Sequence, residues 1–286
     1  MTNPNVSEHH DYDVLIIGAG PTGLYAAYYA GFRGFSVTIV DALAQPGGQV
    51  TAMYPEKDIF DVAGMPRIRG RELIDALVAQ AGAFSPTYVL GEQVQTLTTS
   101  SEGPAVVTTD AGSELEAKAV IITGGIGAFT PRALPTGSDF EGRGLVYFVP
   151  RLEDHRDKDV VIVGGGDSAC DWAVSLHGIA RSITLVHRRD TFRAHAATVD
   201  QVRSLGIEIL TQAEISAVQG SDHIQGVTVT DKSGGTRDLP CQTLVAALGF
   251  IANIGPIAHW GLDLDKRHIA VDSSMRTSLP RVFAAG

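Results

Sequence analysis

The chain has little cysteine and no long apolar run. Cys170 and Cys241 are the two cysteines among 286 residues, and they lie 71 positions apart (241 − 170). This spacing fits neither a C-x-x-C redox pair nor a metal cluster, so we expect two reduced, buried thiols, no bound metal and a cytoplasmic location. No apolar run is as long as the roughly 18 residues of a membrane-spanning helix. The sequence therefore predicts no membrane span.

Basic residues are also in short supply. The chain carries 22 Lys and Arg against 32 Asp and Glu, which gives a net charge of −10. This balance argues against a nucleic-acid-binding protein, for which a basic surface is expected. Apolar residues make up 44% of the chain and charged residues 19%, as in an ordinary globular protein. A length of 286 residues predicts two domains, each with its own core.

Residues 13–41 have the pattern strand, glycine-rich turn, helix, strand. The turn is a G-x-G-x-x-G fingerprint. Gly18 allows the tight turn, Gly20 lets a pyrophosphate approach the backbone, and Gly23 lets the helix lie close to the sheet. The second strand ends at Asp41, 21 residues after Gly20 (41 − 20), where a carboxylate can accept hydrogen bonds from ribose hydroxyls. The stretch predicts a dinucleotide site.

The same pattern recurs later in the chain. Residues 164–169 read GGGDSA, and Gly164, Gly166, Asp167 and Ser168 are the predicted nucleotide contacts of this second turn. The distance from Gly164 to His187 is 23 positions (187 − 164), the same as from the first glycine of the earlier module to its acid (41 − 18). Two modules with matched spacing favour a protein that binds two dinucleotides.

The two modules end in opposite charges. The second strand of the later module ends at His187 and is followed by Arg188 and Arg189, with Arg193 further on. Guanidinium groups bind phosphate oxygens in a bidentate fork, so these cations predict recognition of a 2′-phosphate. We therefore expect NADPH in the second module; a merely solvated basic face is the alternative.

Between and after the fingerprints we expect mostly short strands and one long functional loop. The loop is 42–71, and an amphipathic helix follows it at 72–81. A small antiparallel meander is predicted from strands at 88–90, 94–97, 105–109 and 114–117, followed by a separate buried strand at 119–123. The predicted domains are a discontinuous FAD-binding domain, 1–123 and 251–286, and an NADPH-binding domain, 124–250.

Over essentially its whole length, the sequence resembles the ferredoxin/flavodoxin–NADP reductases of the thioredoxin-reductase-like type. The motifs that carry the resemblance are GAGPTG at 18–23, PGGQ at 46–49, YPEKDIFDVAG at 54–64, GAFTPR at 127–132, GGGDSA at 164–169, HRRDTFRAH at 187–195 and VFAAG at 282–286. The resemblance implies an α/β fold of two Rossmann-like domains, with the NADPH domain inserted into the FAD domain, and a homodimer. It also implies FAD contacts at Thr22, Asp41, Gln49, Tyr54, Val94 and Phe129.

Within that family, Tyr54 is expected to stack on the isoalloxazine ring and Gln49 to hydrogen-bond near the flavin. The backbone at Val94 is expected to bond the adenine edge, although core packing is an even alternative for the side chains of Val94 and Phe129. Thioredoxin reductases carry a C-x-x-C pair just ahead of the second fingerprint, whereas residues 147–154 here contain no cysteine. We therefore expect the flavin to pass electrons directly to ferredoxin or flavodoxin.

Two alternatives stay open, an NADPH diaphorase or quinone reductase on the same scaffold, and a nucleotide-binding protein without catalysis. In the resembling family the segment VFAAG continues into an Asp and a helix that contact FAD. For the chain as given, which ends at Gly286, we therefore expect weakened FAD binding. We also expect an acidic electron carrier to dock at the arginines of the long loop, Arg67, Arg69 and Arg71.

Overall fold

A computed structural model describes the protein over residues 11–125, 127–266 and 268–286. By internal contacts the chain divides into two units. The first contains residues up to Ala52, then Ile59–Ala128 and Ala252–Gly286; the second contains Met53–Asp58 and Phe129–Ile251. The sequence placed the changes of domain at 123/124 and 250/251, and it did not separate the short segment Met53–Asp58 from its neighbours.

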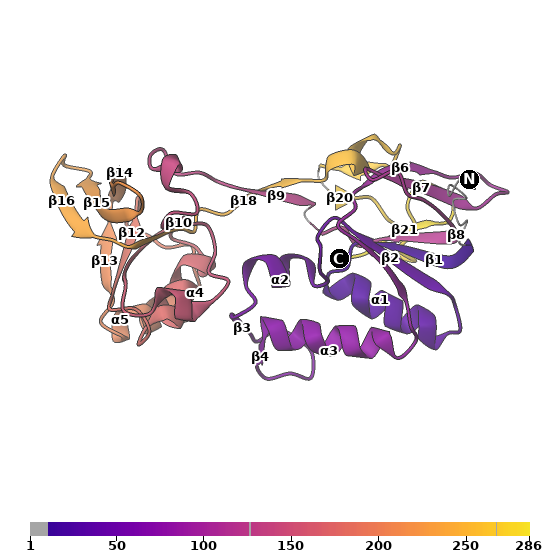
Figure 1. Cartoon of the computed structure of the whole chain (residues 1–286), viewed down its shortest axis with the longest axis horizontal. Helices are drawn as coiled ribbons and strands as arrows, with labels where there is room; N and C mark the ends of the chain where they lie inside the picture. The colour runs from indigo at the N-terminus through magenta and orange to yellow at the C-terminus, as the bar shows by residue number, and fades with distance from the viewer. Residues whose placement is uncertain (1–10, 126, 267) are drawn as a thin grey trace, which may run out of the picture. The chain divides into compact units, whose positions relative to one another are not determined.

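A seven-stranded sheet forms the centre of the first unit (Figure 1). Its order is β5-β2-β1-β8-β7-β6, and β21 pairs with β8. The strands are β1 (Asp11–Ile17), β2 (Val37–Asp41), β5 (Thr87–Leu90), β6 (Val94–Thr98), β7 (Ala105–Thr109), β8 (Glu114–Ile122) and β21 (Val282–Ala284). Strands β5, β2, β1, β8 and β21 run parallel, and β6 and β7 extend the sheet as an antiparallel meander.

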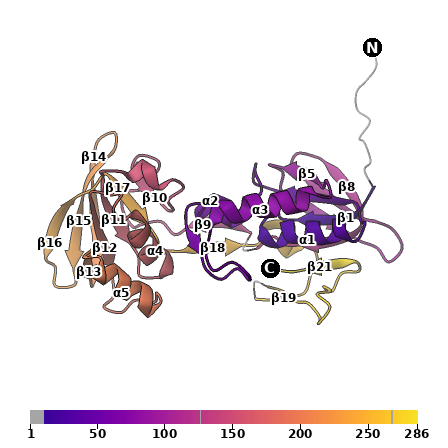
Figure 2. The ribbon, with the colours of Figure 1, turned by 90° about the horizontal axis from the view of Figure 1, so that it is seen from below.

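The helices α1 (Pro21–Phe32) and α3 (Gly70–Gly82) pack against each other beside this sheet (Figure 2). Leu24 and Ala27 of α1 join Ile16 and Ile39 of the strands in one buried cluster, to which Ile74 of α3 also belongs. The predicted helix at 72–81 is therefore confirmed, with its apolar stripe facing the core. Burial of this stripe supplies the main stabilisation, because isolated helices of this length are marginal in water.

The second unit repeats the arrangement with five parallel strands in the order β10-β17-β11-β12-β13. They are β10 (Leu145–Val146), β11 (Asp159–Val163), β12 (Ser182–His187), β13 (Glu208–Thr211) and β17 (Thr243–Ala246), with helices α4 (Asp167–Leu176) and α5 (Ala196–Ser204). A three-stranded antiparallel sheet follows β13 in the chain, formed by β14 (Ala213–Gly220), β15 (Ile224–Asp231) and β16 (Thr236–Pro240).

The remaining elements are short. They are α2 (Gly48–Met53), β3 (Asp58–Ile59), β4 (Ile68–Arg69), β9 (Ala128–Pro131), β18 (Phe250–Asn253), β19 (Leu264–Asp265), β20 (His268–Ile269) and three 3₁₀ helices at Ser138–Phe140, Leu152–His155 and Gly255–His259. Strands β9 and β18, which pair with each other, contain two of the positions where the chain passes from one unit to the other; the other two lie in α2 and β3.

Two predictions of local structure were wrong. The strand at 88–90 does not belong to the antiparallel meander; as β5 it pairs in parallel with β2. The two predicted strands at 114–117 and 119–123 form one strand, β8, because Lys118 continues the strand with its side chain exposed and paired with Asp13 at 2.7 Å. An exposed lysine on a half-buried strand breaks the apolar pattern without breaking the strand.

In the described part of the chain no helix is long and apolar enough to cross a membrane. Within the same residues, no three His, Cys, Asp or Glu side chains gather in a way that could hold a metal ion. Both cysteines are free and buried, as predicted, and burial raises the pKa of the Cys170 thiol to about 11 and of the Cys241 thiol to about 12.

Candidate nucleotide-binding sites

The first fingerprint turn connects β1 to α1. Gly18 has φ +112°, a left-handed value that favours glycine, and its N–H donates to the carbonyl of Val40 at 2.8 Å. A Cβ placed on Gly23 would lie 1.9 Å from the carbonyl oxygen of Gly18. Both glycines are therefore required for α1 to start this close to the end of the strand.

Gly20 differs from Gly18 and Gly23, because the protein does not fill the space beside it. A Cβ added there would meet no protein atom within 4 Å, so the space beside it is open. Gly20 is also the N-cap of α1, whose first N–H groups and positive dipole end are suited to an anion. Thr22 lies exposed in the first turn of the helix. This open space at a helix N-terminus fits a pyrophosphate.

The PGGQ segment lies beside the same turn. The Gly47 N–H donates to the carbonyl of Ala19 at 2.8 Å, and a Cβ on Gly48 would lie 3.1 Å from Gly20 Cα. Gln49 follows in α2, and its side-chain nitrogen would be 3.2 Å from a Cβ on Gly125. The structure thus brings Gln49 to the end of β8, near the fingerprint turn.

Asp41 holds the fingerprint turn as well as ending β2. Its carboxylate accepts hydrogen bonds from the N–H of Ala19 at 2.6 Å and from the N–H of Leu43 at 2.8 Å. The Glu92 N–H donates to the backbone carbonyl of Asp41 at 3.1 Å, which places the segment before β6 next to this acid. Each carboxylate oxygen can accept more than one hydrogen bond, so Asp41 can still accept ribose hydroxyls.

The other three predicted FAD contacts have different surroundings. Val94 is 5% exposed and packs in the core of the first unit, so its side chain has the packing role. Phe129 lies in β9, and its side chain is outside the described residues. Tyr54 belongs to the second unit, where its ring packs against the cluster around α4, burial raises its pKa and Lys57 Nζ lies 5.8 Å from the ring centroid. Stacking of Tyr54 on a flavin stays a prediction.

The second fingerprint turn connects β11 to α4 in the same way. A Cβ on Gly164 would lie 2.5 Å from the carbonyl oxygen of Ala247, whereas one on Gly166 would meet nothing within 4 Å. Gly166 is the N-cap of α4, and Asp167 and Ser168 lie exposed in its first turn. The Asp167 carboxylate accepts the N–H of His195 at 2.9 Å, and so ties the loop after β12 to the helix.

Sequence reasoning missed the contact between Gly165 and His187. The His187 ring is 8% exposed and lies where a Cβ on Gly165 would be, with ring atoms 2.1–2.4 Å from that position. Its Nε2–H donates to the carbonyl of Thr191 at 3.0 Å, and the ring lies 4.9 Å from that of Phe192. The middle glycine of GGG was the available signal, since the fingerprint does not require glycine there.

The three predicted phosphate-binding arginines lie on this loop with exposed side chains. The N–H of Arg193 donates to the carbonyl of Gly165 at 2.7 Å, so the fingerprint turn itself holds the loop in place. In the part of the chain that the structure describes, none of Arg188, Arg189 and Arg193 forms an ion pair. These three cations are available to an anion.

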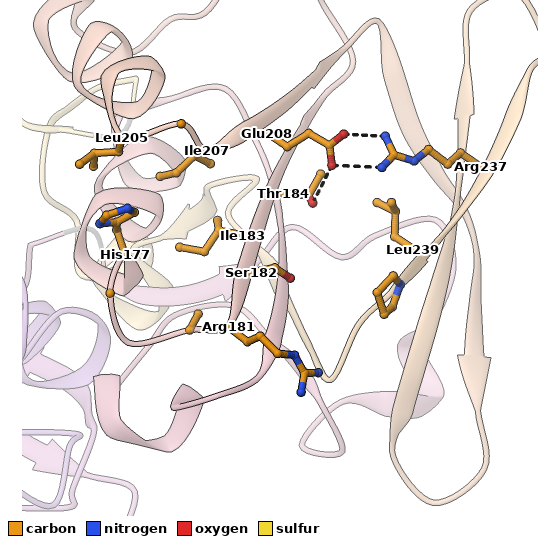
Figure 3. Close-up of a pocket in the computed structure, with 14 residues that line it drawn as sticks. His177, Arg181, Ser182, Ile183, Thr184, Leu205, Ile207, Glu208, Arg237 and Leu239 are labelled. Atoms are coloured by element: carbon orange, nitrogen blue, oxygen red, sulfur yellow. Dashed lines mark hydrogen bonds and ion pairs between the residues drawn. The ribbon is translucent and has the colours of Figure 1, made fainter.

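A hollow of about 490 Å³ lies at the other end of the strands of the second unit's parallel sheet, where β12 and β13 begin (Figure 3). Arg237 donates to Glu208 beside it, at 2.6 and 3.3 Å, and Thr184 donates to the same carboxylate at 3.3 Å. None of the predicted nucleotide contacts lines this hollow. In open parallel sheets, nucleotides bind at the carboxyl ends of the strands, which are the ends that carry the arginines.

Comparison with known proteins agrees with two dinucleotide modules. A family model described as pyridine nucleotide-disulphide oxidoreductase matches residues 12–286. A ferredoxin–NADP reductase of Frankia alni is 58% identical over 274 residues, 96% of this chain and 85% of that relative. Another, of Thermus thermophilus, is 46% identical over 282 residues, 96% of this chain and 84% of that relative.

Among solved structures, the thioredoxin reductase of T. acidophilum matches with a TM-score of 0.83 at 28% identity, over 96% of this chain and 90% of that one. This match and the parallel strands at the centre of both sheets confirm the predicted α/β fold of two Rossmann-like parts.

Proposed function

The chain belongs to the pyridine nucleotide-disulphide oxidoreductase family, and we propose that it passes electrons from NADPH through FAD to ferredoxin. Relatives of 58% and 46% identity over most of the chain are ferredoxin–NADP reductases, and this is the observation that carries the proposal. The enzyme is therefore an FAD-dependent NADPH oxidoreductase.

The residues of the first module fit FAD. The open space beside Gly20 would take the pyrophosphate, and Asp41 would accept the adenosine ribose hydroxyls. Gln49 would lie beside the flavin half, since it is held near the end of β8. When bound, FAD accepts a hydride from NADPH and gives up the electrons one at a time. The chain's own residues bind and orient the cofactor.

The residues of the second module fit NADPH. Gly166 leaves space for the pyrophosphate at the N-terminus of α4, and Arg188, Arg189 and Arg193 supply unpaired cations for the 2′-phosphate. An acid at the place of His187 would accept ribose hydroxyls and would repel this phosphate. The absence of such an acid supports a preference for NADPH over NADH.

The two thiols do not fit an internal electron relay. Cys170 and Cys241 belong to different buried clusters, and burial keeps both thiols protonated at neutral pH. A thiolate is the species that exchanges with a disulfide, so neither cysteine is suited to that chemistry. The electrons therefore leave for an acceptor outside the chain. Buried, reduced thiols also support a cytoplasmic location.

The arginine-rich end of the β3–β4 hairpin is our proposed docking surface for ferredoxin. Arg67, Arg69 and Arg71 lie exposed there, and Phe60 and Met65 add side chains that are 66% and 44% exposed. Exposed arginines on the same segment as exposed apolar side chains suit an acidic protein partner, which the positive charges would steer toward the site. Flavodoxin, the other acceptor that the resemblance implies, would use the same surface.

An aromatic face on α1 supports the homodimer. The helix carries no charged residue, and its neighbourhood holds five rings that are 40–61% exposed: Tyr25, Tyr29, Phe32, Phe35 and Phe84. With about 200 Å² per aromatic side chain, this face exposes about 500 Å² of ring surface, against about 800 Å² per partner in a standard interface. A second copy of the chain would cover it.

A Tyr29→Glu, Phe32→Glu variant should then be monomeric by light scattering, and an unchanged dimer would contradict this assignment.

Reduction of ferredoxin is the test of the proposed function. The protein, supplied with excess FAD, should reduce ferredoxin with NADPH, followed through cytochrome c. The rate should exceed that with a quinone as acceptor, and it should fall as salt is raised. Reduction of the quinone alone would mean a diaphorase, and no NADPH oxidation by flavin-loaded protein would mean a binding protein without catalysis. Either result would contradict the proposal.

A further inference from the structure

A second, larger hollow opens beside the arginine loop. Its volume is about 910 Å³, and it lies between the segment that follows β12 and the turn that joins β15 to β16. Three cations line it, Arg188, Arg189 and Lys232. All three are exposed, and none is in an ion pair within residues 11–125, 127–266 and 268–286.

A backbone link holds Lys232 at this place. The N–H of Gln212 donates to the carbonyl of Arg189 at 3.3 Å, and the N–H of Lys232 donates to the carbonyl of Gln212 at 2.9 Å. Gln212 has φ +51°, a left-handed value that costs free energy in a residue with a side chain. The two hydrogen bonds hold Gln212 in this conformation. Through Gln212 they fix the backbone of Lys232 relative to the backbone of Arg189.

The carboxylates of the hollow have unequal effects. Asp231 is engaged by its own turn, since one of its oxygens accepts the N–H of Ser233 at 2.8 Å and the N–H of Gly235 at 2.9 Å. Asp190 and Glu214 also line the hollow, and both are exposed. Three unpaired cations therefore share the hollow with three carboxylates, one of which points into its own turn, and an anion is favoured beside the two neighbouring arginines.

We propose that Lys232 is a further cation for the 2′-phosphate of NADPH, and that the carboxylate of Glu214, which lines the same hollow, opposes binding of that phosphate. The inference rests on the proposed NADPH site, because it takes the arginine loop as the phosphate end of that site. Lysine binds phosphate as a mobile point charge, so it can complete a site whose planar forks come from Arg188 and Arg189. Lys232 and Glu214 would then adjust the preference for NADPH.

Binding of adenosine 2′,5′-bisphosphate and of 5′-AMP to the flavin-loaded full chain, measured by calorimetry, separates these contributions. The two probes differ only in the 2′-phosphate. Lys232→Ala should weaken the bisphosphate about fivefold, which is about 1 kcal/mol, and should leave 5′-AMP within about twofold. Glu214→Gln should strengthen the bisphosphate about twofold. Arg203→Ala, which removes one exposed cation of α5 in the same unit, is the matched control and should change neither.

The outcomes also separate this inference from the proposed NADPH site. Loss of bisphosphate affinity in Arg188→Ala, Arg189→Ala but not in Lys232→Ala would overturn the role of Lys232 and leave the arginine site standing. Equal weakening of both probes in Lys232→Ala would also overturn it. No effect of the double arginine variant on the bisphosphate would contradict the proposed NADPH site itself.

Discussion

Asp41 and His187 occupy the same place in the two modules, at the end of the second strand, and both contact the residue after the first glycine. The Asp41 carboxylate accepts the N–H of Ala19 at 2.6 Å. His187 instead lays its ring on Gly165, within 2.4 Å of where a Cβ would be. The residue that ends the second strand thus holds the glycine-rich turn against the sheet in both modules. It does so by a hydrogen bond in the first module and by packing of its ring in the second.

With the nucleotides bound as proposed, this difference would couple local packing to the choice of nucleotide. An acid fastens the first turn and also suits free ribose hydroxyls. The histidine ring holds the second turn in place without adding a carboxylate, and its loop presents three unpaired arginines for the proposed 2′-phosphate. Replacing His187 by an acid would therefore alter the charge and the fastening of the turn together.

The last position of each fingerprint, Gly23 or Ala169, shows how closely the helix approaches its turn. We expect the largest change in stability from a substitution at Gly23. Gly23→Ala would put a Cβ 1.9 Å from a backbone oxygen of the first turn. We expect a loss of about 3 kcal/mol in the free energy of unfolding, since overpacked backbone cannot relax easily, with loss of bound FAD. Chemical unfolding and flavin absorbance check this.

The matched change in the second module is Ala169→Gly, because Ala169 stands where the first module has Gly23. It should cost only about 1 kcal/mol, from helix propensity and one lost methyl group. Similar costs for the two variants would mean that the modules do not differ in helix approach.

The fastening residues give the next largest effect. Gly165→Ala would drive a Cβ into the His187 ring, whose Nε2–H is held by the Thr191 carbonyl. We expect a loss of about 2 kcal/mol in unfolding free energy and an NADPH KM raised about tenfold, with normal flavin content. Ala19→Gly, the reverse change in the first module, should cost under about 1 kcal/mol. An unchanged KM for Gly165→Ala would show that the ring does not position the arginine loop.

Mild acid should affect the second unit through His155. This histidine is 6% exposed and its Nδ1 lies 3.1 Å from Thr243 Oγ1; burial lowers its pKa below 6.5. The unfolded chain therefore binds a proton more readily than the folded one. Unfolding free energy should fall as pH drops below about 6.5, by up to about 1.4 kcal/mol for each unit of the pKa depression.

Unfolding measured at pH 7.5 and 5.5 tests this point. His155→Gln should flatten the pH dependence, and His177→Gln, at an exposed histidine, should leave it unchanged. The same slope in the His155 variant would assign the acid sensitivity to other groups.

The smallest effect on activity is expected at the thiols. Counted from the first glycine, Cys170 takes the place of Leu24 (170 − 164 and 24 − 18), and both side chains are fully buried. Cys170 is thus a packing residue like its counterpart. A Cys170→Ser, Cys241→Ser variant should lose stability but keep its NADPH-to-ferredoxin rate. Lost activity in a folded, flavin-loaded variant would contradict this.

Much of this fold follows from the sequence because the strands of both modules are buried on both faces and read as continuous apolar runs. The glycine spacing then located both turns. The residues at the ends of the second strands, Asp41 in one module and the arginines after His187 in the other, gave the opposite charges of the two modules. The predicted side-chain contacts of the first module were less accessible to sequence reasoning. Val94 lies in a half-buried strand where a packing and a binding residue look alike, and the neighbours of Tyr54 depend on packing with residues far along the chain.

Contacts made by backbone geometry were not predictable at all. The packing of His187 on Gly165 and the link through Gln212 involve residues of ordinary type, brought together by a loop that folds back on its turn. The left-handed backbone conformation of Gln212 cannot be predicted from the pattern of residue types around it. These are also the features that decide how the arginines and Lys232 are presented.

The ratio of kcat/KM for NADPH to that for NADH, in Arg188→Ala, Arg189→Ala, tests most directly whether the charge after the second strand selects the nucleotide. Two charge-assisted hydrogen bonds are each worth about 1.5–3 kcal/mol, discounted here because both side chains are exposed. We predict that the ratio falls about 100-fold through a higher KM for NADPH, while kcat/KM for NADH stays within about twofold. An equal loss for both nucleotides, or none, would contradict the account of the two modules.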